Sequence, residues 1–260
     1  MLVGTAVLLS LPAPVHLIRQ CQPHDKEQDS LLTSLTMSVL LPGYPVPRLP
    51  PNRYYPFFMQ MVRPATDMAL QRYSEILPNH NVTVLYGNTL CESGIALNTA
   101  LVDWLDHGAD VFIGPACEYT ASQVSRFLGF RNVPMVTGAA MAMGFRRDGD
   151  HPTITRTQAP YNKMGEAVRD FFVQFAWNHT VMVYRKEDVP ISDCKFAMGS
   201  IYRVLLEHGF QTTHGDFEEV IFKDRDYITM LEEEVMPKAR SKLLLPLSQS
   251  PRLLFLLFLF

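Results

Sequence analysis

Blocks of apolar residues at two different spacings predict an α/β chain. Short continuous apolar runs are typical of buried strands, and stretches with an apolar residue every three or four positions are typical of helices that pack on a sheet. The two kinds of block alternate along the chain, and right-handed crossovers turn such an order into a doubly wound parallel sheet. The predicted strands of a first sheet are residues 35–41, 82–86, 111–113 and 135–137, separated by helices that begin near residues 56, 91 and 118.

A second round of the same β-α-β pattern opens with a strand predicted at residues 153–157. We therefore expect a first α/β lobe over residues 35–150 and a partial second α/β lobe over residues 151–242. The apolar run near the end of the chain has neither helical nor strand alternation. Residues 243–260 are accordingly interpreted as an atypical tail, and residues 1–34 as a signal-like segment followed by a mobile leader.

Composition and charge narrow the classes of function. The 260 residues carry 23 Lys and Arg against 26 Asp and Glu, a net charge of −3, and the basic residues are scattered. No stripe that could follow a phosphate backbone is present, so no nucleic-acid partner is expected. The motifs of nucleophile elbows, phosphate-binding loops, dinucleotide-binding turns and zinc-binding helices are absent from the sequence. No catalytic residue is therefore expected, and the chain is not expected to be an enzyme.

Four cysteines favour disulfides over metal binding if the chain is secreted, because none of them forms a C-x-x-C pair. Two triplets fit the N-glycosylation acceptor, one at Asn81 and one at Asn178. Cys91 and Cys117 each follow the carboxyl end of a predicted parallel strand, which would put them on the same rim of the sheet. From the spacing alone, an ordinary strand-to-helix turn and a disulfide both stay open.

Four segments resemble the extracellular region of natriuretic-peptide receptors, which are periplasmic-binding-protein-like type I ligand-binding domains. They are MVRPATDMAL at residues 61–70, GPACEYTASQVSR at 114–126, VPMVTGAAMAMGF at 133–145 and TRTQAPYNKMGE at 155–166. The similarity covers about residues 35–240, which is the first half or so of that region.

The resemblance implies a bilobal clamshell that binds a peptide hormone, secreted or on the extracellular face of the plasma membrane. In full-length relatives the domain pairs as a homodimer and is coupled to guanylate cyclase signalling or to hormone clearance. Attachment to a membrane is expected only through a segment that this chain lacks. The second lobe is expected to be incomplete.

Several residues near the first-lobe rim take their expected roles from the resemblance. It pairs Cys91 with Cys117 and places a chloride ion beside that disulfide, held by the Thr89 hydroxyl and the backbone N–H groups of Ala116 and Cys117. Independently of the family, backbone N–H groups at the start of a helix suit an anion. No other cofactor and no metal is expected.

The same resemblance assigns the hormone contacts and leaves one cysteine open. Tyr119 and Arg126 match contact positions in the first lobe, and Asp216 and Phe217 match contact positions in the second. The relatives' partner for Cys194 falls after residue 240, where the sequence has leucines and no cysteine. A bond from Cys194 to Cys21 and a free thiol both stay open.

Two other interpretations remain at this stage. Clamshells of the same class include sensors that close on a small ligand of the amino-acid type. The chain could also be a truncated product without stable function, in which case a protease would cut residues 153–260 faster than the first lobe.

Overall fold

The computed structural model describes residues 33–47, 49, 55–146, 149–185, 191–217, 228–235, 237, 241–245 and 255–259. All the described residues belong to one compact unit, Thr33–Phe260. The segment predicted as a signal and leader, including Cys21, therefore lies outside the described residues, except that Thr33 and Ser34 already belong to the first strand.

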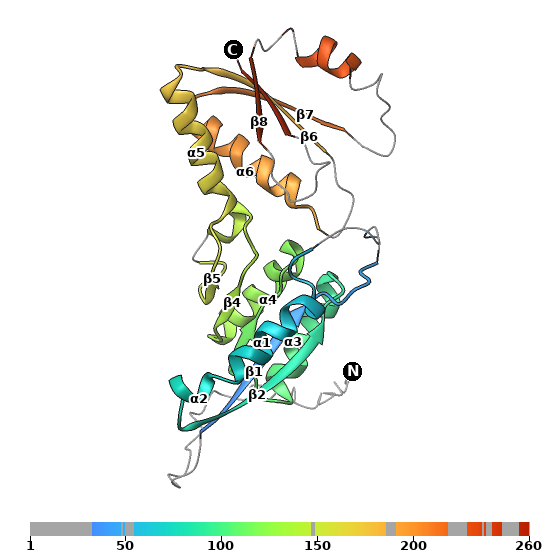
Figure 1. Cartoon of the computed structure of the whole chain (residues 1–260), viewed down its shortest axis with the longest axis vertical. Helices are drawn as coiled ribbons and strands as arrows, with labels where there is room; N and C mark the ends of the chain where they lie inside the picture. Colours follow the sequence, from blue (N-terminus) through green and yellow to red (C-terminus); the bar gives the residue numbers. More distant parts are fainter. Residues whose placement is uncertain are drawn as a thin grey trace, which may run out of the picture. The chain divides into compact units, whose positions relative to one another are not determined.

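Five parallel strands form the first sheet, in the order β2-β1-β3-β4-β5. The predicted doubly wound pattern is confirmed, because the first strand, β1, lies inside the sheet and later strands are added on both sides of it (Figure 1). The strands are β1 (Thr33–Leu41), β2 (His80–Asn88), β3 (Val111–Ile113), β4 (Met135–Thr137) and β5 (Ile154–Arg156). The helices that connect them are α1 (Met59–Leu70), α2 (Tyr73–Ile76), α3 (Ser93–Leu105) and α4 (Glu118–Arg131).

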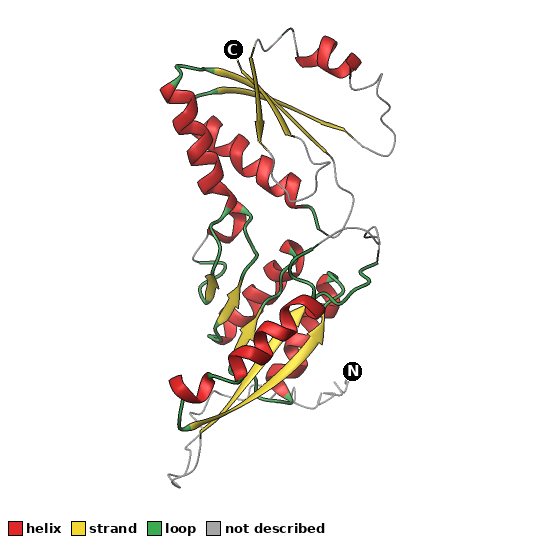
Figure 2. Cartoon of the chain, viewed as in Figure 1, coloured by secondary structure: helices red, strands yellow, loops and turns green. Residues whose placement is uncertain are grey.

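Alternation along β1 explains why both faces of this sheet are covered. Leu40 is fully buried in a cluster with residues of α3 and α4, whereas its neighbours Val39 and Leu41 are buried in a second cluster, against which partly buried residues of α1 pack. Successive side chains of a strand point to opposite faces, so one apolar run supplies the core on both sides. The carboxyl end of β1 is consequently held between two layers of helix (Figure 2).

The strand predicted to open the second lobe belongs to the first sheet instead. β5 pairs in parallel with β4, with Ile154 opposite Met135 and Arg156 opposite Thr137. The boundary predicted at residue 150 is therefore too early, because three more residues of sheet follow it. A short run such as Ile154–Arg156 shows that a strand is present, but its hydrogen-bonding partners are set by the edge of the sheet that is free to receive it.

The second sheet was expected to be parallel, but it is mixed. β6 (His179–Arg185) and β7 (Gln211–Phe217) pair in parallel, residue for residue. β9 (Phe255–Leu259) then pairs antiparallel with β6, and β8 (Ser241–Leu245) pairs antiparallel with β9, which gives the order β7-β6-β9-β8.

Residues 243–245 and 255–259 are thus part of the second sheet, contrary to the interpretation of residues 243–260 as an atypical tail. Its lack of alternation is no argument against a strand, since strands covered on both faces read as continuous apolar runs. Val183 of β6 lies opposite Leu256, and Thr180 opposite Leu259. This pairing supplies β6 with neighbours on both sides.

Helices α5 (Tyr161–Gln174) and α6 (Asp193–Glu207) pack against each other and enclose the second core. Gly165 allows the close approach, because an added Cβ there would lie 2.9 Å from Val204 and 3.2 Å from the Cα of Ile201. Phe172 and Cys194 are buried in this core. Among the residues that the structure describes, no helix is both long enough and apolar enough to cross a bilayer.

Candidate functional site

The turn that joins β3 to α4 is built on a glycine that no other residue can replace without strain. Gly114 has φ +84°, in the left-handed region that residues with a Cβ rarely adopt. A Cβ at this position would also overlap the backbone carbonyl oxygen of Leu40. β1 and the turn therefore approach each other backbone to backbone, and the next three residues are delivered to the rim of the sheet.

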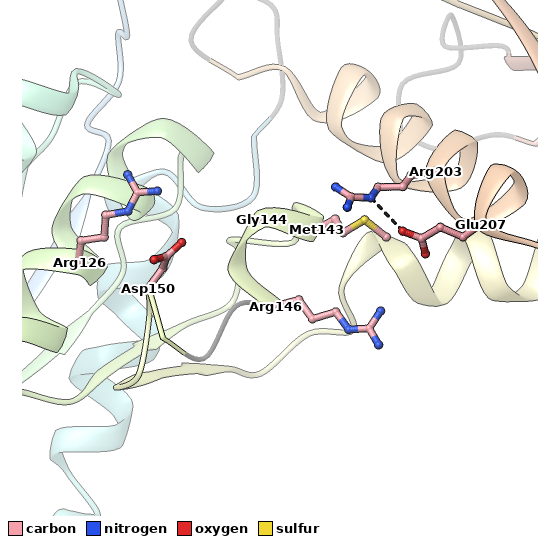
Figure 3. Close-up of a pocket in the computed structure, with 7 residues that line it drawn as sticks. All are labelled: Arg126, Met143, Gly144, Arg146, Asp150, Arg203 and Glu207. Carbon is pink, nitrogen blue, oxygen red and sulfur yellow. Dashed lines mark hydrogen bonds and ion pairs between the residues drawn. The ribbon is translucent and has the colours of Figure 1, made fainter.

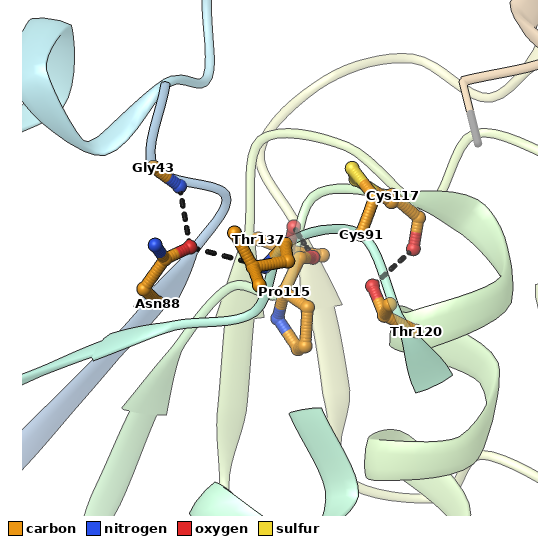
Figure 4. Close-up of a disulfide and its surroundings, with 8 residues drawn as sticks. Gly43, Asn88, Cys91, Pro115, Cys117, Thr120 and Thr137 are labelled. Atoms are coloured by element: carbon orange, nitrogen blue, oxygen red, sulfur yellow. Dashed lines mark hydrogen bonds between the residues drawn. A yellow bond between two sulfur atoms is a disulfide. The ribbon is translucent and has the colours of Figure 1, made fainter. Parts of the chain in front are cut away.

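Threonine hydroxyls fix the carbonyl groups of this turn (Figure 4). The Thr137 Oγ1 donates to the Pro115 carbonyl at 2.9 Å and accepts the Ala139 N–H at 3.1 Å. The Thr120 Oγ1 donates to the Cys117 carbonyl at 2.7 Å. The Pro115 and Ala139 partners follow the carboxyl ends of β3 and β4, and Cys117 is the N-cap of α4, so hydrogen bonds from two elements hold the turn in one conformation.

A disulfide between Cys91 and Cys117 ties the end of β2 to the start of α4, with the two Cα atoms 5.5 Å apart. This is the pairing that the resemblance implies. The preceding turn is also fixed by a side chain, because the Asn88 Oδ1 accepts the Gly43 N–H at 2.7 Å and the Leu90 N–H at 3.0 Å. The ends of β1, β2 and β3 are thereby connected to one another at the same rim.

The three residues expected to hold chloride are all buried at this rim. Thr89, Ala116 and Cys117 are at most 3% exposed. Among the described residues, the Thr89 Oγ1 has no hydrogen-bond partner, which is costly for a buried hydroxyl. Ala116 and Cys117 stand immediately before the first turn of α4, where backbone N–H groups lack partners within the helix. A buried hydroxyl without a partner and the N–H groups at the start of α4, two segments that the Cys91–Cys117 disulfide joins, are a set of donors that fits an anion.

Glu118, at the first position of α4, is a buried carboxylate that sequence reasoning missed. Its two oxygens accept the N–H groups of Met141 at 2.8 Å and Ala142 at 3.3 Å. The pKa of Glu118 is raised to about 7, chiefly by burial; the two N–H bonds and the Arg156 guanidinium oppose this rise, and the nearby carboxylate of Asp193 adds to it. Glu118 thus connects the start of α4 to the segment that leaves β4.

This carboxylate is expected to make the protein less stable as the pH rises from about 4.5 to about 7. In that window the folded protein keeps a proton on Glu118 that the unfolded chain releases, and the difference amounts to about 3 kcal/mol. In Glu118→Gln the free energy of unfolding, measured in urea between pH 5.0 and 7.5, should no longer show this decline. The exposed Glu207, exchanged for Gln, is the control that keeps it. An unchanged pH dependence in Glu118→Gln would contradict the assignment.

The expected hormone contacts Tyr119 and Arg126 lie on one exposed face of α4. They are seven residues apart, which is about two helical turns, and the exposed residues Gln123 and Phe130 continue the same face. The opposite face of the helix is buried. Tyr119, 49% exposed, makes an edge-to-face contact with Phe196 of α6, with ring centroids 5.4 Å apart.

Arg126 lines a hollow in which most of the lining side chains are charged (Figure 3). The short helix η1 (Met143–Arg146) and helix α6 supply other parts of its wall. Arg203 of α6 is paired there with Glu207 at 3.0 Å. The lining residues are Arg126, Met143, Gly144, Arg146, Asp150, Arg203 and Glu207. Three guanidinium groups against two carboxylates give the hollow a positive balance that suits a carboxylate or carbonyl group.

The expected second-lobe contacts Asp216 and Phe217 are the last two residues of β7, paired with Tyr184 and Arg185 of β6. Their backbone therefore lies at the carboxyl end of the strand, and their side chains lie outside the described part of the structure. Both expected glycosylation sites are exposed: Asn81 is the second residue of β2, and Asn178 directly precedes β6.

Residues 61–228 match the family described as "Receptor family ligand binding region". The chain belongs to this family. Over 193 residues it is 31% identical to atrial natriuretic peptide receptor 3 of Bos taurus and 30% identical to that of Homo sapiens, covering 68% of this chain and 34% of each receptor. Over 166 residues it is 30% identical to atrial natriuretic peptide receptor 2 of Homo sapiens, covering 60% of this chain and 15% of that receptor. The chain thus spans about a third or less of these relatives.

Within this receptor-family ligand-binding region, the matched segment includes the disulfide, the whole of α4 and β7. Asn88, Glu118 and Thr137 support its rim and were missed from the sequence. A signal for two of them exists, since Asn88 and Thr137 are polar residues at the carboxyl ends of strands, where ligand sites of open α/β sheets gather. Glu118 has the ordinary place of an acidic residue in a first helical turn, so its burial has no signal in the sequence.

Proposed function

We propose that this chain supplies part of the peptide-hormone-binding extracellular region of a natriuretic-peptide-type receptor. The family match and the names of the relatives support this class of ligand. The proposed role is binding without catalysis. In full-length relatives we infer coupling to guanylate cyclase signalling or to hormone clearance, with two copies paired as a homodimer.

The exposed face of α4 is the observation that carries the proposal. Tyr119 and Arg126 present an aromatic ring and a guanidinium group, the side-chain types enriched among residues that dominate binding energy at interfaces. Their helix is held at its start by the disulfide and by the hydrogen bonds of Glu118. A contact surface that is already ordered loses less conformational entropy when it binds.

Asp216 and Phe217 complete the proposed contact surface from the second lobe. A carboxylate can accept hydrogen bonds from the peptide backbone or pair with a basic residue, and a phenyl ring can fill an apolar pocket of the hormone. Their place at the carboxyl end of β7 supports this role, because loops and strand ends on that side carry the ligand sites of open α/β sheets.

A chloride ion beside the disulfide belongs to the same proposal. The Thr89 hydroxyl and the N–H groups of Ala116 and Cys117 would hold it. An anion there would satisfy the buried donors and keep the start of α4 in place. Its support is the orphaned Thr89 Oγ1, and no reaction step depends on it.

Titration of the purified chain with a natriuretic-type peptide tests the proposed function. Tyr119→Ala and Arg126→Ala are each expected to weaken binding by about tenfold or more, because truncating an interface anchor costs about 1.4 kcal/mol or more. Isothermal titration calorimetry gives both affinity and stoichiometry. Repeating the titration with gluconate in place of chloride should weaken peptide binding, because the start of α4 would lose the proposed chloride ion.

Arg72→Ala is the matched control, since it removes an exposed arginine of the same lobe that lies outside α4. Its affinity for the peptide should equal that of the unaltered chain. Equal losses in all three variants would contradict a contact surface on α4. Tight one-to-one binding of free amino acids, with no binding of peptide, would replace the proposal by a small-ligand sensor.

A further inference from the structure

Four aromatic rings, each in contact with the next, lead from the second core to the surface. Phe172 is fully buried and meets the half-buried Trp177 edge to face, with centroids 6.0 Å apart. Trp177 stacks on Phe175 at 4.9 Å with 23° between the ring planes, and Phe175 stacks on Phe171 at 6.2 Å with 13°. The inner rings are anchored in the core, so the outer two are held by a rigid support.

The outer two rings, Phe171 and Phe175, are each 54% exposed. A single exposed apolar residue is ordinary on a protein surface. Two near-parallel rings in contact with each other form a contiguous exposed apolar patch instead, and such patches are typical of interaction sites. We define Phe171 and Phe175 as the aromatic platform.

The chain leaves this platform through a tight helix end. α5 ends at Gln174, and Ala176 follows in the left-handed region with φ 54°. The Trp177 N–H bonds to the Phe172 carbonyl at 2.9 Å, and the Ala176 N–H to the Val173 carbonyl at 3.2 Å. These two bonds make a Schellman motif, with the Phe172–Trp177 contact as its apolar partner pair. The backbone that follows is therefore fixed relative to the platform.

Asn178 is the next residue, exposed and three positions after Phe175. Its carbonyl accepts the Gln211 N–H at 2.9 Å, which fixes its backbone to β7. Asn178, His179 and Thr180 form an acceptor triplet for N-glycosylation. The acceptor residue is thus exposed and lies three positions after Phe175, on a backbone fixed by the helix end and by β7.

We propose that Asn178 carries an N-linked glycan whose innermost N-acetylglucosamine packs on the aromatic platform. The amide nitrogen Nδ2 forms a bond to C1 of the sugar and loses a proton. The bond between C1 and the diphosphate of a lipid-linked oligosaccharide breaks, and the lipid diphosphate leaves with the electron pair. No oxidation or reduction takes place.

The chemistry of the two partners accounts for the packing. A pyranose ring has a face of C–H groups, whose partial positive charge suits the negative face of an aromatic ring. Covering the platform also removes apolar surface from water. The covalent link to Asn178 gives the sugar a high effective concentration at the platform, so even a weak contact is occupied.

The triplet at Asn81 is a natural control within the same chain. Asn81 is also exposed and is also followed by Thr at the third position. The three residues before it are Pro78, Asn79 and His80, so it lacks a phenylalanine at the position that Phe175 occupies before Asn178. We therefore expect a glycan there to lack the ring contact proposed for the glycan at Asn178.

The test uses the full chain secreted from glycosylating cells, in an Asn81→Gln background, with site occupancy measured by mass spectrometry. Asn178 should be occupied. Removing the whole glycan with an amidase should lower the melting temperature by about 2–4 °C, the range for a change of about 1 kcal/mol in a domain of this size. An endoglycosidase that leaves one N-acetylglucosamine should leave the melting temperature unchanged.

Phe175→Ala and Phe171→Ala should abolish the difference between glycosylated and deglycosylated protein. Val173→Ala, which alters an exposed apolar residue of α5 that has no place in the ring stack, should preserve it. The proposal is overturned by an unoccupied Asn178, or by a difference in melting temperature that is the same with and without the Phe175 ring. Hormone affinity is not a readout here, so the outcome is independent of the proposed function.

Discussion

Gly114→Ala is expected to lower the free energy of unfolding of the first lobe by about 3–5 kcal/mol. Two causes add up at this residue. An alanine would be held at φ +84°, and its Cβ would overlap the carbonyl oxygen of Leu40, a backbone atom that cannot move aside as the end of a side chain can. Relief of either problem would shift β1 or the turn that carries Cys117 and α4.

The first lobe can be followed on its own, because the chain has one tryptophan in each core. Trp104 packs against the first core and Trp177 against the second. In a Trp177→Phe background, urea unfolding followed by Trp104 fluorescence therefore reports the first lobe.

Gly94→Ala is the matched control for this measurement. Gly94 lies in the first turn of α3 with open space around its Cα. Alanine is favoured over glycine in a helix, so this variant should be neutral or more stable by up to about 1 kcal/mol. Equal stabilities for the Gly114 and Gly94 variants would show that the turn tolerates a side chain and would contradict the packing described for the rim.

Loss of the Cys91–Cys117 disulfide is expected to destabilise the same lobe by about 3–4 kcal/mol. The bond closes a loop with a sequence separation of 26 residues, and restricting the unfolded chain over such a loop contributes about that amount in the chain-entropy description. Replacing both cysteines by alanine is preferable to serine, because both sites are buried in an apolar cluster where hydroxyl groups would lack partners. Unfolding in urea, again followed by Trp104 fluorescence, measures the loss.

Reductant provides the control for the disulfide. It should destabilise the unaltered chain by a similar amount and leave the double alanine variant unchanged. Cys194→Ala, in the second core, should keep the full effect of reductant on the first lobe. A first lobe that is equally stable with and without reductant would show that the bond contributes nothing measurable.

Both changes act on the support of α4, not on its exposed face. The hormone contacts proposed at Tyr119 and Arg126 depend on where the helix begins, and its start is fixed by the turn at Gly114, the disulfide and Glu118. Milder perturbations of the rim should therefore weaken peptide binding without altering any residue of the contact surface.

The apolar pattern by itself determined four of the five strands of the first sheet, their helical connections and the rim on which Cys91 and Cys117 lie. Each of these follows from local spacing, since an alternating or continuous apolar run has few ways to be buried. The glycine at position 114 by itself also indicates that the strand ends there in a turn.

Only the tertiary structure decided which edge receives a strand and which polar group becomes buried. β5 joined the first sheet and β9 joined β6, because backbone pairing depends on the free edges of the folded sheets and not on the residues of the added strand. Glu118 became buried because Met141 and Ala142 fold back over it from another element. The aromatic platform beside Asn178 likewise arises from a helix end that aligns four rings, a relation in space that the spacing of the residues does not contain.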